Sequence, residues 1–388
     1  MSRLPPHFTL LQVTPELETG GAEQTTLDVG AAVVKAGGLS IVASRGGRMA
    51  GQLGVGGSAL VEMPVHSKNP LTILGNAIHL ANIIDREKVS LIHVRSRAPA
   101  FSALIAAQAL RIPFLATYHG LYNSKSGLKR WYNAIMTRGD LVIANSEFTR
   151  AHIIAEHHID PAKVIAIPRG VDLTRFDPAK VSEARAIALR RQWGIGPAET
   201  RTVFLLAGRL TRWKGQRLLI DAAARLKAAG RSDFIVVLAG DDQGRGAYRT
   251  ELEGAIAAAG LGDAVRIVGH CDDMPAAYLA ADIACTPSLD PEAFGRTAVE
   301  PQAMGRPVLA ADHGGARETV APSETGWLVT PGDAGAWATA MAMALDAGPK
   351  RRETMGKAGM ARARRLYSVQ AMCEATLAVY ARLVGRRG

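Results

Sequence analysis

The 388-residue chain has few cysteines, few aromatic residues and no long apolar run. Its cysteines, Cys271, Cys285 and Cys373, are odd in number and lack C-x-x-C spacing, which argues against a disulfide framework and a structural zinc site. Aromatic residues make up only 5% of the chain and no nucleic-acid-binding motif is present, so nucleic acid is not the expected partner. No stretch of about 18 apolar residues occurs, so we expect no membrane-spanning helix.

The remaining composition is that of a folded protein. Apolar residues account for 48% and charged residues for 21%, which excludes disorder as the dominant state. The net charge of +11 is compatible with a phosphorylated substrate or an anionic membrane and selects neither. The first residues include two prolines and only a short apolar run, so we expect no signal peptide. We therefore expect a cytoplasmic protein, with peripheral contact to the inner face of the plasma membrane as an open alternative.

Short β-type runs alternate with helical patterns along the chain. Most of these runs are continuously apolar, as is typical of parallel strands covered on both faces, and the helices between them indicate βαβ units. The pattern predicts an α/β protein with two doubly wound, Rossmann-like domains. The predicted strands are residues 8–13, 39–43, 91–94, 114–118, 141–144 and 164–167, followed by 202–207, 234–239, 265–268, 282–285, 307–310 and 326–329.

A polar stretch at residues 177–180, a charged helix and a glycine-containing break at 194–197 separate the two series of strands. We predict an N-terminal domain over residues 1–180 and a C-terminal domain over 181–365. The remaining residues, 366–388, are expected to form a helix that packs back across the domain junction.

Glycines follow the first predicted strand directly. The sequence TGGAE at residues 19–23 leads into a helix, and bare amides at a helix N-terminus suit a phosphate or a polar sugar. A tight structural turn explains these residues equally well. No G-x-G-x-x-G that opens a helix and no G-K-[ST] occurs, so neither a dinucleotide fingerprint nor a P-loop is indicated.

Charged residues follow two predicted strands of the second half. Arg209 and Lys214 lie beyond the carboxyl end of a strand, where α/β sheets bind ligands, and can clamp a diphosphate. Glu292 and Glu300 are spaced so that a loop and the following helix can present both carboxylates on one side. A site in which carboxylates bind hydroxyl groups and the backbone amides at a helix N-terminus bind phosphates fits a nucleotide sugar. A solvated turn, a capping acid and a surface acid are the structural alternatives.

Short motifs occur in a fixed order from about residue 12 to about residue 330. They are GGxE at 20–23, TYHG at 117–120, NS at 145–146, PRGVD at 168–172, GR…KG at 208–215, E-x7-E at 292–300, GG at 314–315 and GWLV at 326–329. Their set and order resemble the retaining family-4 glycosyltransferases of the GT-B fold. Within that family, residues 240–318 are most similar to bacterial enzymes of lipopolysaccharide or surface-polysaccharide assembly.

The resemblance implies two Rossmann-like domains that face each other across a cleft, with a role for each motif. Arg209 and Lys214 would hold the donor diphosphate and stabilise the leaving group without a metal. Glu292 would bind hydroxyls of the donor sugar, and Glu300 those of the ribose. His119 would lie over the donor sugar near the anomeric carbon. The donor-binding residues implied through their backbone are Gly20, Gly21, Gly269, His270, Phe294, Gly295 and Arg296.

The implied activity is a retaining, metal-independent hexosyl transfer that needs no cofactor. The donor would be a nucleotide sugar, with UDP as the family's majority nucleotide, and the acceptor a saccharide or lipid-linked glycan of lipopolysaccharide or polysaccharide biosynthesis. The leaving phosphate would take the acceptor's proton during front-side substitution. A nucleotide-sugar 2-epimerase on the same fold and a non-enzymic basic binding protein are the alternatives. The sugar and the oligomeric state stay open.

A basic segment with aromatic residues follows His119. Residues 119–138 contain four basic residues and no acid, and apolar residues recur with helical spacing from Leu128. Such a helix can lie on anionic lipid, or it can be an ordinary helix that buries its apolar face, and both interpretations stay open. The candidate membrane or acceptor contacts are Lys125, Lys129, Arg130, Trp131 and Tyr132.

Overall fold

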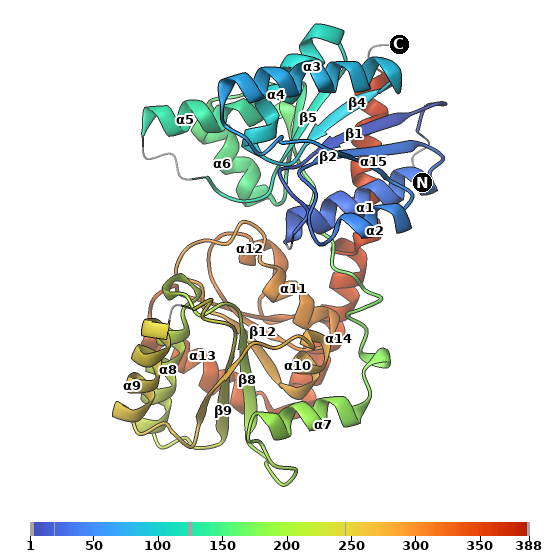
Figure 1. Ribbon diagram of the computed structural model, residues 1–388. Helices are drawn as coiled ribbons and strands as arrows, with labels where there is room; N and C mark the ends of the chain where they lie inside the picture. Colours follow the sequence, from blue (N-terminus) through green and yellow to red (C-terminus); the bar gives the residue numbers. More distant parts are fainter. Residues whose placement is uncertain (1–3, 19, 123–125, 245, 386–388) are drawn as a thin grey trace. The chain divides into compact units, whose positions relative to one another are not determined.

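The computed structural model describes residues 4–18, 20–122, 126–244 and 246–385. The chain forms two compact α/β units (Figure 1). The first comprises Met1–Gly170 together with Val369–Gly388, and the second comprises Val171–Ser368.

The first unit is built on a seven-stranded parallel sheet with the order β3-β2-β1-β4-β5-β6-β7. Its strands are β1 Thr9–Val13, β2 Leu39–Ser44, β3 Ala59–Glu62, β4 Leu91–Val94, β5 Phe114–Tyr118, β6 Leu141–Ala144 and β7 Val164–Ala166. Its helices are α1 Gly21–Lys35, α2 Ala50–Val55, α3 Pro70–Arg86, α4 Arg97–Leu110, α5 Gly127–Asn133, α6 Glu147–His157 and α15 Val369–Gly385.

The second unit contains a six-stranded parallel sheet with the order β10-β9-β8-β11-β12-β13. Its strands are β8 Thr202–Ala207, β9 Phe234–Ala239, β10 Val265–Gly269, β11 Ile283–Thr286, β12 Val308–Ala311 and β13 Gly326–Val329. Its helices are α7 Glu183–Gln192, α8 Gln216–Ala228, α9 Gly246–Ala258, α10 Met274–Ala280, α11 Arg296–Ala303, α12 Ala316–Thr319, α13 Ala334–Asp346 and α14 Gly348–Leu366.

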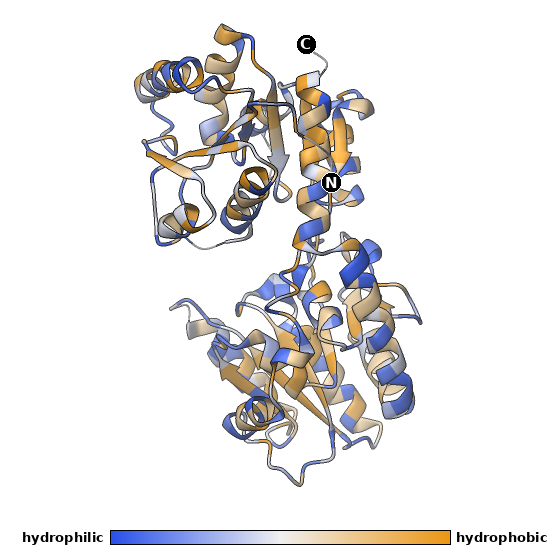
Figure 2. Ribbon diagram, turned by 90° about the vertical axis from the view of Figure 1, so that its right-hand side faces the viewer, coloured by the Kyte–Doolittle hydropathy of each residue, from blue (hydrophilic) through white to orange (hydrophobic). Residues whose placement is uncertain are grey.

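The predicted fold class, two doubly wound parallel sheets, is confirmed. Central strands are buried on both faces, so successive residues of one strand enter different cores. In β1, Leu10 packs in a layer with α15, whereas Leu11 packs in the opposite layer with α3 and α4. Figure 2 shows the hydrophobic colour concentrated on the strands. Strand β3 was not predicted, because this edge strand is only partly buried and its apolar run is just three residues long, Ala59 to Val61.

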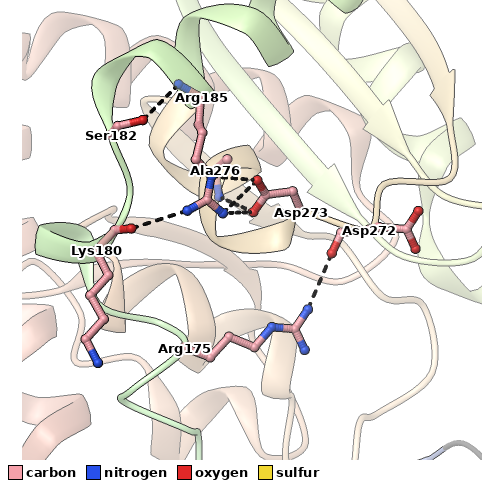
Figure 3. A network of polar contacts seen from close by, with 7 residues as sticks. All are labelled: Arg175, Lys180, Ser182, Arg185, Asp272, Asp273 and Ala276. Carbon is pink, nitrogen blue, oxygen red and sulfur yellow. Dashed lines mark hydrogen bonds and ion pairs between the residues drawn. The ribbon is translucent and has the colours of Figure 1, made fainter.

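Residues 171–180 belong to the second unit, so the division lies earlier than the sequence-based boundary at residue 180. A network of polar contacts holds this segment and α7 (Figure 3). Arg185 forms a bidentate ion pair with Asp273, with 2.8 Å from Nη2 to each carboxylate oxygen, and donates to the Lys180 carbonyl. Arg175 donates to the carbonyl of Asp272 at 3.4 Å. These partners all lie in the second unit, and together they fasten the connecting segment to it.

The C-terminal region is two helices, α14 and α15, with a break at residues 367–368. The Tyr367 hydroxyl donates to the Glu318 carbonyl at 2.6 Å, and the Val171 amide donates to the Tyr367 carbonyl at 2.6 Å. Helix α14 therefore ends in the second unit, while α15 packs against α1 in the first. The sequence contains no glycine or proline at this break, so helix signals alone did not predict it.

A buried polar chain joins α15 to the sheet of the first unit. His93 of β4 lies 2.6 Å from the Tyr380 hydroxyl through Nδ1 and 2.6 Å from the Thr117 hydroxyl through Nε2. Both His93 and Tyr380 are fully buried, and the Tyr380 ring stacks on Phe8 with centroids 5.9 Å apart. Burial and the nearby Arg95 lower the pKa of His93 well below 6.5, so the ring is neutral.

Replacing Tyr380 by Phe tests this chain of hydrogen bonds. The substitution keeps the ring but leaves Nδ1 of His93 buried without a partner, which we expect to cost about 1–3 kcal/mol of unfolding free energy. Thermal unfolding followed by circular dichroism measures the effect. Tyr132→Phe is the matched control, because the Tyr132 hydroxyl makes no hydrogen bond to a described residue. Equal melting temperatures for the two variants would contradict the prediction.

Candidate functional site

The order of the second sheet reverses between β8 and β11, and ligands of doubly wound sheets bind where the loops diverge at such a point. The loop after β8 carries Lys214, and the loop after β11 carries Glu292. Lys214 Nζ lies 2.7 Å from Glu292 Oε1, and the two side chains are only 13% and 18% exposed. The Ser288 hydroxyl donates to the same oxygen at 2.6 Å. No described residue donates to Glu292 Oε2, which leaves that oxygen as an acceptor.

Glycines allow the loops after β8 and β12 to approach the loop after β11 closely. A Cβ atom at Gly215, where φ is +79°, would lie 2.0 Å from the carbonyl oxygen of Pro287. A Cβ atom at Gly314, where φ is +59°, would lie 2.5 Å from the carbonyl oxygen of Glu292. The Gly315 amide then donates to that same carbonyl at 2.8 Å. Both positions therefore require glycine for space and for backbone conformation.

His313, a loop residue whose role the sequence motifs leave undecided, is part of this arrangement. Its Nε2 lies 2.8 Å from the Ser288 carbonyl, and because a carbonyl only accepts, Nε2 carries the proton. His313 thus holds the backbone of the residue whose hydroxyl contacts Glu292. Its position directly before the pair Gly314 and Gly315 is the signal that sequence reasoning did not use.

Arg209 extends from the end of β8 toward solvent. Its carbonyl accepts a hydrogen bond from Nε2 of the fully buried Gln216 at 2.9 Å, which fixes the backbone. Its side chain is exposed and makes no hydrogen bond or ion pair to a described residue. Arg209 and Lys214 therefore differ: Arg209 is free to meet a ligand, whereas Lys214 is preset by Glu292 and lies 4.3 Å from the Trp213 ring centroid.

Glu300 is buried, 7% exposed, so the alternative of a surface acid is wrong. Arg296 Nη2 lies 2.7 Å from its Oε1, and the Tyr278 hydroxyl donates to its Oε2 at 3.2 Å. Burial and the Glu300 charge raise the pKa of Tyr278 well above its ordinary value. Helix α11 begins after Gly295 with no side-chain cap, and Phe294 is buried against Tyr367.

Gly269 and His270 lie at the end of the edge strand β10. The Gly269 carbonyl accepts from the Gly240 amide at 2.7 Å, and φ of Gly269 is +75°. His270 is exposed, with Nε2 2.9 Å from Asp272. The described contacts do not connect either residue with Lys214 or Glu292, so their predicted role toward the base stays a prediction.

In the first unit, His119 follows β5 and is held by two neighbouring loops. The Arg169 guanidinium lies 2.7 Å from His119 Nδ1, and the Asn145 amide donates to the His119 carbonyl at 3.2 Å. Burial and the charges of Arg169 and Arg95 lower the pKa of His119 well below 6.5. Because arginine only donates, Nδ1 accepts and the proton is on Nε2. Nε2 is buried and has no partner in the described part of the chain, so it is a donor held ready for a ligand.

Arg169 also adjoins the glycine motif at the start of α1. A Cβ atom at Gly21 would lie 2.2 Å from Arg169 Nη1, so the guanidinium lies against the backbone at this helix start. Gly20, the residue before α1, provides no side-chain cap. Sequence reasoning included Arg169 only within the PRGVD motif and assigned it no role. The structure brings it together with both His119 and Gly21.

Arg95 lies where the first sheet reverses its order, directly after β4, and was not singled out by sequence reasoning. It is 3% exposed and donates to the Gln12 side chain at 2.5 Å, while its Nε has no partner among the described residues. Burial lowers its pKa. A buried cation without a carboxylate partner is costly and favours an anion nearby.

From the sequence, His157 and its neighbour His158 are expected at the surface, but Nε2 of His157 lies 2.8 Å from the hydroxyl of the buried Tyr118. In the basic segment, Leu128 and Trp131 are 76% and 53% exposed, so they do not join the core, whereas Ile135 is buried. Lys125 lies outside the described residues.

Within the described ranges, no group of three His, Cys, Asp or Glu side chains forms a candidate metal site. In the same ranges no helix is long and apolar enough to cross a membrane.

Gly314→Ala tests the close approach of the loops around Glu292. Alanine costs about 1–2 kcal/mol at positive φ, and its Cβ would also meet the Glu292 backbone. Gly332→Ala is the matched control, because φ is +73° there and nothing lies within 4 Å of the added atom. We expect Gly314→Ala to lower the melting temperature clearly more than Gly332→Ala. Similar shifts would show that only backbone conformation matters at Gly314.

The neutral histidines predict how stability depends on pH. His93 and His119 have pKa values well below 6.5 when folded, so the unfolded chain binds more protons near that pH. Stability should be full above pH about 6.5 and fall as the pH drops, by about 1.4 kcal/mol per pH unit for each histidine. Urea unfolding between about pH 7 and 5.5 measures this slope. His119→Gln should show a shallower slope, and an unchanged slope would contradict the assignment.

Two family models match consecutive parts of the chain: Glycosyltransferase Family 4 over residues 19–175 and Glycosyl transferases group 1 over residues 190–362. The D-inositol 3-phosphate glycosyltransferase of Salinispora tropica is 37% identical over 237 residues, covering 59% of this chain and 48% of that protein. D-inositol 3-phosphate glycosyltransferase 2 of Catenulispora acidiphila is 35% identical, covering 64% and 58%. The chain thus spans about half the length of the curated relatives it matches.

Solved structures match over nearly the whole chain. A glycosyltransferase from Rickettsia africae is 32% identical, covers 98% of this chain and 99% of its own, and superposes with a TM-score of 0.89. Anabaena HepE in complex with UDP-glucose is 26% identical with a TM-score of 0.78, covering 96% and 98%. The chain belongs to the family-4 glycosyltransferases of the GT-B fold.

Proposed function

We propose that the protein is a retaining glycosyltransferase that takes a sugar from a UDP-sugar. The observation that carries this proposal is the largely buried Lys214–Glu292 pair at the point where the second sheet reverses its order. It places a cation for a diphosphate beside a carboxylate for sugar hydroxyls. The UDP-glucose complex of HepE supports the choice of nucleotide.

Lys214 and Arg209 bind the two phosphates in this proposal. Arg209 is exposed and without a described partner, so it reaches the ligand, while Lys214 is already oriented by Glu292. Glu292 keeps Oε2 as an acceptor for hydroxyls of the donor sugar. Because Ser288 and Lys214 both donate to Oε1, the carboxylate loses little freedom when the sugar binds.

Helix α11 completes the proposed donor site. Its uncapped N-terminus after Gly295 offers backbone amides and a positive dipole end to the diphosphate. Glu300 is held by Arg296 and Tyr278, and each of its oxygens can still accept a further hydrogen bond, here from a ribose hydroxyl.

No side chain of the enzyme forms a covalent bond with the sugar in the proposed transfer step. The bond between the anomeric carbon and the donor's phosphate oxygen breaks, and a bond to the acceptor oxygen forms on the same face of the sugar. The acceptor's proton goes to the departing phosphate, which leaves as UDP. Lys214 and Arg209 stabilise the developing negative charge, the role a metal ion plays elsewhere. Neutral His119 donates from Nε2 to a sugar hydroxyl, and Arg169 acts as its positioning residue.

The proposed acceptor is a saccharide or lipid-linked glycan of bacterial lipopolysaccharide or surface-polysaccharide assembly. This class comes from the sequence resemblance of residues 240–318. The curated relatives are named for D-inositol 3-phosphate, so an inositol phosphate belongs in the same acceptor panel.

Nucleotide release from a panel of UDP-, GDP- and ADP-sugars, with and without acceptors, tests the donor site. We expect release from a UDP-sugar, and a loss of about 100-fold or more in kcat/KM for Lys214→Ala and Glu292→Gln. Lys227→Ala removes a cation from a surface ion pair with Asp263 in the same unit and should leave the rate unchanged. Wild-type rates in Glu292→Gln would refute the proposed role of the pair.

The products and a chelator separate the remaining alternatives. A transferase forms a glycoside with retained configuration, seen by NMR, whereas a 2-epimerase yields epimerised donor or free sugar without any acceptor. Because Lys214 and Arg209 supply the positive charge, we expect EDTA to leave turnover unchanged. Loss of activity in EDTA, restored by a divalent cation, would contradict the metal-independent mechanism.

A further inference from the structure

The loop from β10 to α10, residues 270–273, is held by α7 and by the connecting segment, residues 171–180. Asp273, the last residue of the loop, caps α10 by accepting a hydrogen bond from the Ala276 amide at 3.2 Å. The same carboxylate pairs with Arg185 of α7, whose Nη2 lies 2.8 Å from each of its oxygens (Figure 3). One carboxylate therefore joins the loop, the start of α10 and the start of α7.

The loop depends on this support because it follows an edge strand. Strand β10 has β9 as its neighbour in the sheet, and the register of the pair shifts between Ile267 and Gly269. Gly269 has a φ of +75°, a backbone conformation that favours glycine. The regular register thus ends before the loop begins, and the position of the loop depends on the contacts of Asp273 at its other end.

A second contact leads from the connecting segment to Glu300. Phe176 is 4% exposed, and its ring centroid lies 6.2 Å from that of Tyr278 in α10. The Tyr278 hydroxyl donates to Glu300 Oε2 at 3.2 Å. Phe176 and Tyr278 share one hydrophobic core with Val299, the residue before Glu300. A change at Phe176 therefore reaches the carboxylate to which the proposed function assigns the ribose.

The base and the ribose are the parts of the proposed donor that meet these elements. The family resemblance assigns the base to the backbone at Gly269 and His270, where the loop begins, and the ribose to Glu300. The diphosphate is assigned to Arg209 and Lys214, which lie on the loop after β8. The connecting segment and α7 thus support the nucleoside part of the site, and a different loop supports the phosphate part.

We propose that Arg185 and Phe176 are positioning residues for the nucleoside of the donor. Arg185 holds the loop through Asp273 where the loop meets the base, and Phe176 holds Tyr278 so that Glu300 meets the ribose. In this arrangement neither Arg185 nor Phe176 touches the donor. This role rests on the proposed function, since it requires a UDP-sugar as the donor.

Isothermal titration calorimetry with UDP and with inorganic pyrophosphate separates the nucleoside from the diphosphate. We expect Arg185→Ala and Phe176→Leu each to weaken UDP binding about five- to tenfold, while pyrophosphate binding stays within about twofold of the wild type. In turnover, KM for the donor should rise while kcat stays near the wild-type value, because binding is lost equally in the ground state and the transition state. Melting temperatures establish that both variants fold.

Variants of the ion pair test whether Arg185 acts through Asp273. Asp273→Asn keeps a side chain that caps helices well but removes the charge, so it should weaken UDP binding about as much as Arg185→Ala does. The double variant should bind UDP no more weakly than either single variant, and additive losses would contradict the role of the pair. Arg185→Lys keeps the charge without the bidentate geometry and should restore part of the affinity.

Arg249→Ala is the matched control, because it breaks an ion pair of similar exposure with Glu253 on α9 of the same unit. It should leave both affinities unchanged. Wild-type UDP affinity in Arg185→Ala and Phe176→Leu, or an equal loss of pyrophosphate binding, would overturn the positioning role alone. A wild-type protein that binds no UDP would instead refute the proposed function, and the positioning role with it.

Discussion

In each unit, the order of the parallel sheet reverses at a single place, between β1 and β4 and between β8 and β11. At that place the loops after neighbouring strands run to opposite sides, so the backbone cannot fill the space between them. The singled-out residues follow from this constraint: Gly21 and Arg95 lie beyond β1 and β4, while Lys214 and Glu292 lie beyond β8 and β11. The rest of each unit holds these loop starts at fixed positions.

The two reversal points carry charge in different ways. In the second unit Lys214 and Glu292 neutralise each other, so the site is stable when empty, and a ligand that replaces one partner must supply equivalent interactions. In the first unit Arg95 is more deeply buried, and among the described residues Gln12 is the one side chain that accepts a hydrogen bond from it. An anion would lower the energy of this cation more than it would that of Lys214, because an unpaired buried charge retains its desolvation cost.

The sequence predicted what depends on local pattern. Apolar runs gave each interior strand within a residue or two, and the glycine and charge motifs gave Lys214, Glu292 and His119. Strand β3 was missed because its apolar run is only three residues long. The break between α14 and α15 was missed because it arises from contacts of Tyr367 with distant residues. Arg169 and His313 were missed as site residues for a related reason: their partners are far away in sequence, and the partner alone gives each its role.

The C-terminal helix shows how far such long-range dependence extends within the first unit. Tyr380 contacts His93, His93 contacts Thr117 of β5, and His119 follows Thr117 by two residues, directly after the end of that strand. The end of β5 that presents His119 is therefore held in part by a hydroxyl from the last helix. Burial lowers the pKa of both His93 and His119, and the two residues are linked through β4 and β5, which pair directly in the sheet. The placement of His119 thus depends on residues of β4 and α15, and not on the TYHG motif alone.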